Sequence, residues 1–490
     1  MRGVTAPGAP FRDAAVLGGT NRAAELAYGR GARTHVRTGI AGRSVAVAAG
    51  LVASLALYAG LAVWLYGVPA SLSSDDAFFF SRGLERFSLL DFSPHFPGYP
   101  GFILTGRLFL AAFGEPAATL QTMSVTFALA LPALAYLTAA RWRLAPLPRT
   151  ALLLAALSMP LLPLVALDGL SDGAGVALFV ASLAVLPRQP GNAVAAGLVA
   201  GLFLGLSVTM RPSLAVLPAV MVLVILIEAP RLAVGVILGG VLAVVPAALF
   251  VWAHEGAAVV GELERFVVGH TLAWGNTVFA GSEARWTAAL GREPFLAAAV
   301  ALAVATGLGG LVLWRRLALT QKVVTASLLA IAIWTWAMQN PDNLRHLLPL
   351  LVLGPLALVA VVRDRRAATL CLGALLALNA ATALRATASW ESAPAPLAAA
   401  ARHINVRGAA DILVTHRGVH LLRAELRRTR VYDGYSAAGA AASRTQDDAA
   451  TLYRLTGTRP ETCDLAATFG ARVPGERTLH LCREPAGDAR

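Results

Sequence analysis

Two neighbouring carboxylates, Asp75 and Asp76, are the residues of this chain best suited to acid–base chemistry. They follow the first long apolar segment directly, where charge beside hydrocarbon is disfavoured unless it is paired or used. A carboxylate beside a hydroxyl group takes its proton as a new bond forms, while a neighbouring carboxylate orients the partner or holds a metal. The alternative is structural, because Ser74 and the two acids suit the start of a helix near Ala77. The two interpretations are compatible.

Further candidates for binding lie in other polar clusters. His95 and Tyr99 stand in a Pro/Gly-rich stretch of the same loop. Asp172 follows a tight turn in which glycine allows a sharp reversal, so it is either a second site carboxylate or an ordinary hydrated turn residue. His270 lies in a long loop that mixes aromatic and polar residues, as substrate-binding loops and lids do.

Isolated cations between apolar runs are candidate ligands for a phosphate group. Arg211 stands between two such runs, and Arg345 with His346 begins a later one. A planar guanidinium binds phosphate through two parallel hydrogen bonds. The alternative is that these side chains extend to the membrane surface as anchors.

The composition identifies a membrane protein. Of 490 residues, 57% are apolar and only 14% are charged, too few to cover a soluble protein of this size. The net charge of +13 comes from arginines in short clusters between apolar runs, with no nucleic-acid-binding motif. We therefore expect the lipid bilayer, and no nucleic acid, as a partner.

The apolar runs predict about eleven transmembrane helices and an all-α polytopic fold. The predicted spans are 45–67, 117–140, 150–167, 173–187, 192–209, 213–228, 232–252, 295–314, 323–339, 346–362 and 367–385.

The placement of basic residues predicts the orientation. Cytoplasmic loops carry an excess of arginine and lysine, and here every second loop is basic. These loops hold Arg141, Arg143, Arg149, Arg188, Arg231, Arg315, Arg316, Lys322, Arg363, Arg365 and Arg366. The pattern predicts a multi-pass protein of the cytoplasmic (inner) membrane with the N-terminus inside and the C-terminus outside. The acidic pair then lies in the first outside loop, 68–116, and His270 in a large one, 253–294.

Three domains are expected. Residues 1–44 are polar and aperiodic, which predicts a disordered cytoplasmic leader. Residues 45–385 form the membrane domain, and residues 386–490 a small α/β domain outside the membrane. Its expected elements are a strand at 411–415, a helix at 419–428 and a strand at 478–482.

The three cysteines differ in setting. Cys371 lies within a span and is expected to be a packed apolar residue. Cys463 and Cys482 lie in the tail, where an oxidising exterior would allow them to pair. The sequence leaves that pairing open.

The order of these features resembles the GT-C membrane glycosyltransferases, especially glycosyltransferase family 39, the protein O-mannosyltransferase and aminoarabinose-transferase group. That family opens its first outside loop with an acidic pair, and the match here is Asp75-Asp76-Ala77-Phe78-Phe79. The resemblance extends over about residues 45–385. Its other elements are His95-Phe96-Pro97-Gly98-Tyr99-Pro100, Asp172, Thr209-Met210-Arg211-Pro212 and Arg345-His346-Leu347-Leu348-Pro349.

The resemblance implies an inverting transfer of a sugar from a polyprenyl-phosphate donor to an acceptor on the outer face. Asp75 would be the general base, and Asp76 and Asp172 would shape or metallate the site. Arg345 and Arg211 would hold the leaving phosphate. No cofactor is required, although a divalent metal at the acidic pair is compatible with the pattern. The sugar and the acceptor, whether glycan, lipid or protein, stay open.

Three other classes fit less well. A lipid or sugar transporter or flippase would place polar residues at mid-membrane in broken helices, whereas here they gather at the outer ends. An O-antigen-ligase-like enzyme would use arginine and histidine in a large outside loop, as 253–294 offers. A non-catalytic scaffold would need none of these residues.

Overall fold

The computed structural model describes the chain in several stretches. They are residues 45, 47–187, 193–273, 277–278, 286–386, 390–407, 411–434, 436, 439, 441 and 451–483. The predicted leader, 1–44, and the inside-loop residue Arg188 lie outside them. The chain divides into two units, residues 1–51 and 52–490, and the second holds every element discussed below except the start of the helix Val47–Gly67.

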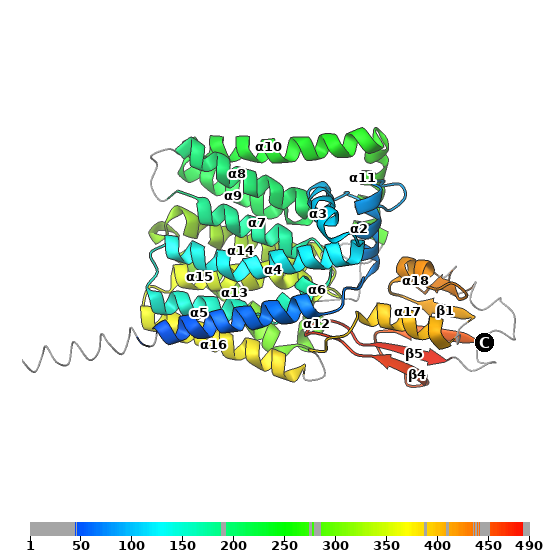
Figure 1. Cartoon of the computed structure of the whole chain (residues 1–490). Coiled ribbons are helices and arrows are strands. Elements are labelled where there is room, and N and C mark those ends of the chain that lie inside the picture. Colours follow the sequence, from blue (N-terminus) through cyan, green and yellow to red (C-terminus); the bar gives the residue numbers. More distant parts are fainter. Residues whose placement is uncertain are drawn as a thin grey trace, which may run out of the picture. The chain divides into compact units, whose positions relative to one another are not determined.

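Helices dominate the second unit, and the long ones run side by side (Figure 1). They are α2 (Asp75–Glu85), α3 (Pro100–Phe113), α4 (Pro116–Arg141), α5 (Pro146–Leu157), α6 (Leu162–Leu167), α7 (Asp172–Val185), α8 (Ala193–Met210), α9 (Val216–Glu228), α10 (Pro230–Glu255), α11 (Ala258–Val268), α12 (Trp286–Gly291), α13 (Pro294–Val312), α14 (Leu319–Met338), α15 (Leu348–Val361), α16 (Arg365–Arg385), α17 (Pro396–Arg407) and α18 (Val419–Glu425).

The prediction of an all-α polytopic membrane protein with a small C-terminal sheet domain is confirmed. In the described stretches, eight helices are long and apolar enough to cross a membrane, so the expected count of about eleven is not confirmed. The eight are Val47–Gly67, Pro116–Arg141, Ala193–Met210, Pro230–Glu255, Pro294–Val312, Leu319–Met338, Leu344–Val361 and Arg365–Arg385. Four apolar helices are shorter, since prolines and polar turns interrupt their runs: Pro100–Phe113, Pro146–Leu157, Asp172–Val185 and Pro212–Glu228.

The acidic pair opens helix α2, as the capping interpretation predicted. The hydroxyl oxygen of Ser74 accepts a hydrogen bond from the backbone N–H of Ala77 at 3.2 Å. Both carboxylates lie in the first turn, where the helix dipole favours negative charge. The helix begins two residues earlier than expected, at Asp75. Capping fixes the backbone of the pair and leaves the carboxylate groups available for other contacts.

Glycines hold helix α8 closely against α10. A Cβ at Gly201 would collide with the backbone of Val236, and one at Gly239 with the backbone of Leu198. Neither position tolerates a side chain, because the opposing atoms are backbone. Helix α8 ends one residue before Arg211, so this packing fixes the point from which the Arg211 side chain extends.

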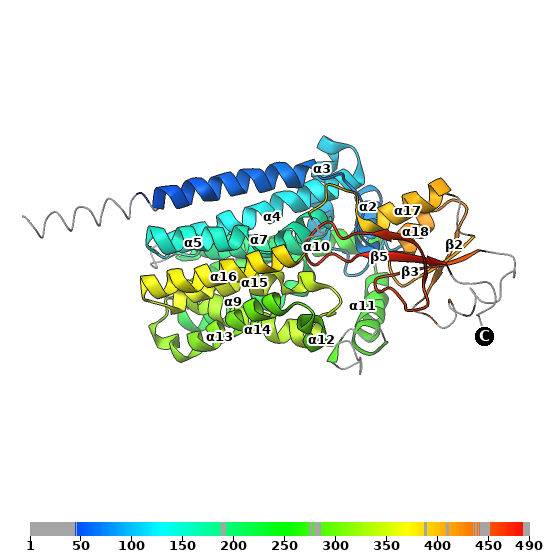
Figure 2. The same ribbon diagram turned by 90° about the horizontal axis from the view of Figure 1, so that it is seen from below.

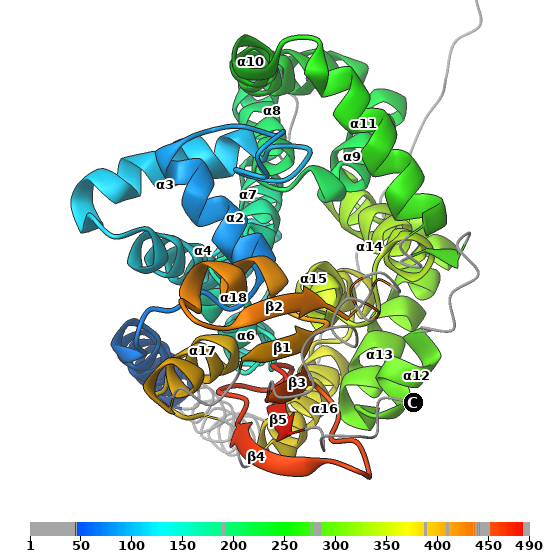
Figure 3. The same cartoon turned by 90° about the vertical axis from the view of Figure 1, so that its right-hand side faces the viewer.

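The C-terminal domain is a five-stranded sheet with two helices against it (Figure 3). The strands are β1 (Ile412–Thr415), β2 (Arg430–Asp433), β3 (Leu452–Thr456), β4 (Asp464–Phe469) and β5 (Leu479–Arg483). Their order is β2-β1-β3-β5-β4, with β1 parallel to both neighbours and the β3–β5 and β5–β4 pairs antiparallel. The three elements expected from the sequence correspond to β1, α18 and β5. Leucines of α17, α18, β3 and β5 share one core with this sheet.

The question about the cysteines is settled in this structure. Cys463 and Cys482 form a disulfide that joins β4 to β5, and Cys371 is a free, half-buried thiol in α16. The bridge therefore closes the hairpin made by the last two strands.

The tip of this hairpin is buried in the helical domain. The C-terminal domain lies beyond one end of the helices, at the right in both side views (Figure 1, Figure 2). Val473, in the β4–β5 loop, is fully buried in the helical core, and Gly475 lies against Leu161 and Leu164 of the α5–α6 region. The contact makes the hairpin a shared part of both domains.

Candidate active site

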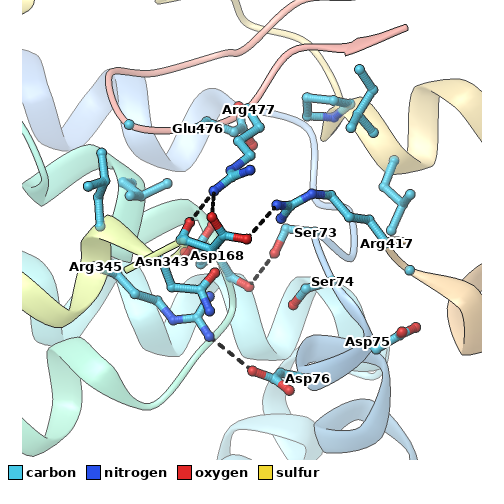
Figure 4. A pocket seen from close by; sticks show the side chains of 18 of the residues that line it. Ser73, Ser74, Asp75, Asp76, Asp168, Asn343, Arg345, Arg417, Glu476 and Arg477 are labelled. Atoms are coloured by element: carbon cyan, nitrogen blue, oxygen red, sulfur yellow. Dashed lines mark hydrogen bonds and ion pairs between the residues drawn. The ribbon is translucent and has the colours of Figure 1, made fainter. Parts of the chain in front are cut away.

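A cavity of about 320 Å³ lies where the segment 73–76, the ends of two helical segments and the C-terminal domain meet (Figure 4). Its lining residues come from distant parts of the chain: Ser73, Ser74, Asp75, Asp76, Leu164, Asp168, Asn340, Asp342, Asn343, Leu344, Arg345, Pro396, Leu397, His416, Arg417, Gly418, Gly475, Glu476, Arg477 and Leu479. Of the sequence-predicted candidates, it contains Asp75, Asp76 and Arg345.

A chain of ion pairs leads inward from this cavity. Arg345 lies between two carboxylates, with its Nη2 3.0 Å from Asp76 Oδ2 and its Nε 3.5 Å from Asp172 Oδ2. Arg211 Nη2 lies 3.1 Å from the other oxygen of Asp172. The expected meeting of the acidic pair, Asp172, Arg211 and Arg345 is thus present, and Asp76 rather than Asp75 makes the contact. We call these four residues, Asp76, Arg345, Asp172 and Arg211, the inner network.

The inner network is buried except at its outer end. The side chains of Arg211, Asp172 and Arg345 are only 6%, 9% and 12% exposed, whereas that of Asp76 is 36% exposed. Charges are strong in such surroundings because little water screens them. Among the described residues, Asp172 Oδ2 and Arg345 Nε make no hydrogen bond, but they lie 3.5 Å from each other. The contact between these two buried atoms is therefore an ion pair just behind a solvent-accessible carboxylate.

Electrostatics keep Asp76 ionised. Burial raises its pKa, but the positive charges of its neighbours outweigh that effect and leave the pKa below its usual value. His95 is one of these neighbours, yet burial lowers its own pKa, so it is neutral near pH 7. The guanidiniums of Arg345 and Arg211 are thus the charges that lower the pKa of Asp76 near pH 7.

His95 and Tyr99 support the inner network from behind and do not line the cavity. His95 Nε2 lies 3.3 Å from the Tyr99 hydroxyl, and the guanidinium of Arg211 stands 5.7 Å from the centre of the Tyr99 ring. Burial raises the pKa of Tyr99 to about 12, so its hydroxyl stays protonated. Their placement fits a structural role for both side chains, and substrate binding by them stays a prediction.

The two other predicted histidines also lie off the cavity wall. His346 Nδ1 lies 4.0 Å from Asp172 Oδ1, at a small separate cavity of about 10 Å³. His270 forms a hydrogen bond of 3.1 Å with the carbonyl of Met338 at the end of α14. Neither contact brings an imidazole to the larger cavity.

Asp75 faces the C-terminal domain. Its Oδ1 accepts hydrogen bonds from the backbone N–H groups of His420 and Leu421, both at 2.9 Å. Burial raises the pKa of Asp75, and the two N–H groups together with the nearby His420 oppose that effect without cancelling it. Asp75 is consequently a stronger base than an ordinary aspartate, whereas Asp76 is a weaker one.

The upper wall of the cavity carries a second charge cluster that sequence reasoning missed. Arg477 Nη2 lies 2.9 Å from Asp342 Oδ1 and also donates to the Asp342 carbonyl at 2.7 Å. Arg417 Nη2 lies 3.5 Å from Asp342 Oδ2. We call Asp342, Arg417 and Arg477 the outer cluster. A usable signal was the position of Arg417 two residues after the end of β1, because ligand sites favour the carboxyl ends of parallel strands.

Asp168 lies between the inner network and the outer cluster and is only 7% exposed. Burial raises its pKa to about 7, while Arg345 acts in the opposite direction. Asp168 follows the last residue of α6 and begins the turn that leads to α7. Its buried position therefore allows this carboxyl group to take up a proton near neutral pH.

The described residues contain no group of three or more His, Cys, Asp or Glu side chains placed to hold a metal ion. A metal at Asp75 and Asp76 stays a prediction. What the geometry provides is a carboxylate base, a second carboxylate fixed by arginine, and positive charge behind both. These groups suit the displacement of an anionic leaving group by a hydroxyl.

Comparison with known proteins gives likenesses to solved structures. No protein-family model matches the chain, and no curated protein matches it. The chain is similar to crystal structures of ArnT from Cupriavidus metallidurans. The structure bound to undecaprenyl phosphate has a TM-score of 0.48 and 13% identity, over 89% of this chain and 97% of that one. The apo structure has a TM-score of 0.45 and 13% identity, over 89% and 98%. At such values the likeness leaves the function to be inferred from the side chains.

Proposed function

We propose that this protein is an integral membrane glycosyltransferase that moves a sugar from a polyprenyl-phosphate donor to an acceptor on the outer face of the membrane. The observation that carries the proposal is the inner network, which ends in solvent-accessible Asp76 beside Asp75 at a 320 Å³ cavity. The order of motifs that resembles GT-C enzymes points to the same reaction.

The reaction is a single displacement. The acceptor hydroxyl oxygen attacks the anomeric carbon, its proton passes to Asp75, and the bond from that carbon to the phosphate oxygen breaks. The phosphate leaves with the bonding electrons, and the anomeric configuration inverts. The raised pKa of Asp75 suits a general base, since a base is most effective when its pKa approaches the working pH.

The guanidiniums stabilise the departing phosphate. Arg345 lines the cavity, and Arg211 lies behind it on the other side of Asp172. Preorganised positive charge in a site with little water is worth several kcal/mol, on the order of 3, to a developing anion. Because arginine supplies that charge, we expect transfer to continue when divalent cations are chelated.

The experiment is a transfer assay in membranes with labelled polyprenyl-phosphate sugars. Wild type should transfer label to an acceptor, and Asp75→Asn should reduce the rate by about 10²–10⁴-fold. Glu85→Gln, at the exposed end of the same helix, is the matched control and should keep the wild-type rate. Full activity of a stably folded Asp75→Asn would refute the assignment of the base. The absence of transfer from every donor by wild type would refute the function.

A further inference from the structure

The start of helix α18 lies against the acidic pair, although 345 residues separate it from Asp75 in the chain. Gly418 precedes the helix with φ of +63°, a backbone conformation that glycine adopts without strain. A Cβ there would also collide with Leu397 of α17. The chain thus turns tightly between β1 and α18 and presents the first N–H groups of the helix to Asp75.

The contact occupies only one oxygen of the carboxylate. Both N–H groups, from His420 and Leu421, bond to Oδ1. Among the described residues, no hydrogen bond is made to Oδ2. The carboxylate is therefore held in one orientation while its second oxygen stays available. The His420 ring packs 5.1 Å from that of Phe79 on α2, which reinforces the contact of the two helices.

We propose that the C-terminal domain is a working part of the transfer site: the backbone N–H groups of His420 and Leu421 position the Asp75 carboxylate so that Oδ2 receives the acceptor proton. This inference rests on the proposed function. It makes His420 a positioning residue that acts through its backbone. It also gives a defined role to residues 386–490, which lie outside the part of the sequence that resembles the GT-C family.

The same contact sets the basicity of Asp75. An N–H donor favours the ionised carboxylate, so removing one donor raises the pKa. The other groups that act on this carboxyl are Asp76 on its own helix and the imidazole of His420 on α18. A test must therefore compare two variants that differ only in the backbone N–H at position 420. Asp76 and the imidazole of His420 must be affected equally in both.

His420→Pro and His420→Ala form that matched pair. Both remove the imidazole, and only proline removes the N–H. His420 is the second residue of α18, and proline is accepted in the first turn of a helix because no intrahelical bond is lost there. We expect His420→Pro to lower the rate constant by about tenfold relative to His420→Ala. The acid limb of its pH–rate profile should move to higher pH, because fewer Asp75 side chains are ionised at a given acidic pH. Equal rates and equal pH profiles for the two variants would overturn the inference.

Hydrogen exchange provides a readout that does not depend on activity. Asn at position 75 keeps an oxygen that accepts both bonds, whereas Ala does not. We expect the α18 amides to exchange faster in Asp75→Ala than in wild type and to stay protected in Asp75→Asn. Equal exchange in all three proteins would show that Asp75 does not hold α18 and would overturn the inference even if sugar transfer is observed. A wild type without transfer but with the expected exchange pattern would refute the proposed function and, with it, the role in positioning a base.

Discussion

The inner network and the outer cluster have similar chemistry and opposite exposure. Both place arginines around a carboxylate. In the inner network Asp172 and its two arginines are 6–12% exposed, whereas in the outer cluster Asp342, Arg417 and Arg477 are 29–38% exposed. Buried charges are costly to separate, while exposed pairs are screened and exchange with water. The inner network therefore suits a fixed electrostatic site, and the outer cluster suits contacts that open and close as substrates enter.

The largest expected effect is on the inner network. Arg211→Gln leaves the 9%-exposed Asp172 with one arginine instead of two. We expect a loss of about 3–5 kcal/mol in unfolding free energy, the usual result of breaking a buried pair. Thermal unfolding in detergent micelles measures it.

The control for this variant is the exposed pair Arg86–Asp91 just after α2, whose side chains are 80% and 46% exposed. Arg86→Gln should change stability by about 0–1 kcal/mol. If Arg211→Gln lowered the unfolding free energy no more than Arg86→Gln, the distinction between buried and exposed ion pairs would be wrong.

Asp168, between the two clusters, predicts a pH-dependent effect. Its pKa of about 7 in the folded protein lies above the usual value. Between pH 4 and pH 7 the unfolded state releases this proton first, so folding becomes less favourable as pH rises and the cost is complete above pH 7. Asp168→Asn removes that cost. We expect it to stabilise the protein at pH 8 by at most about 4 kcal/mol and to leave stability unchanged at pH 4.

The measurement is the difference in melting temperature between Asp168→Asn and wild type as a function of pH. A difference that stays constant from pH 4 to pH 8 would contradict the raised pKa.

The disulfide supports the outer side of the site. Cys463 and Cys482 are 19 residues apart, and a bridge that closes a loop of this size contributes about 3 kcal/mol. The bridge closes the hairpin whose loop carries Glu476 and Arg477 to the cavity. Replacing both cysteines with serine should lower stability by that amount and weaken transfer. Cys371→Ser, the control in α16, should do neither.

The smallest effect is expected in the outer cluster. Arg417→Gln removes the weaker of the two partners of Asp342, at 3.5 Å, and leaves Arg477 at 2.9 Å. Exposed pairs contribute about 0–1 kcal/mol. We expect unchanged thermal stability and a change of less than about fivefold in KM. A drop in melting temperature as large as that of Arg211→Gln would contradict the claim that the inner network contributes more to stability than the outer cluster.

Sequence reasoning succeeded where one local pattern decides the outcome. Apolar runs predicted the membrane helices, and Ser74 before two acids predicted the cap of α2. It also found the members of the inner network, because isolated charges beside apolar runs are rare enough to notice. The count of about eleven spans is not confirmed, and the helices are short in the regions around Pro160 and Pro163.

The rest depended on tertiary contact. Nothing local distinguishes Asp75 from Asp76, yet helix geometry directs one towards α18 and the other towards Arg345. Arg477 stands in a hairpin loop that is buried in the helical domain through Val473, in the helical core, and Gly475, which lies against Leu161 and Leu164. The outer cluster was therefore outside the reach of a single sequence.

The most direct test of the account compares carrier binding with transfer in the same detergent-solubilised samples. Binding of a labelled polyprenyl phosphate and transfer from the matching sugar donor are measured for wild type, Asp75→Asn and Arg345→Gln, each checked for folding by size exclusion. The account predicts that Asp75→Asn binds the carrier like wild type and transfers at least about 100-fold more slowly, whereas Arg345→Gln loses carrier binding. Wild-type transfer by Asp75→Asn, or wild-type carrier binding by Arg345→Gln, would contradict it.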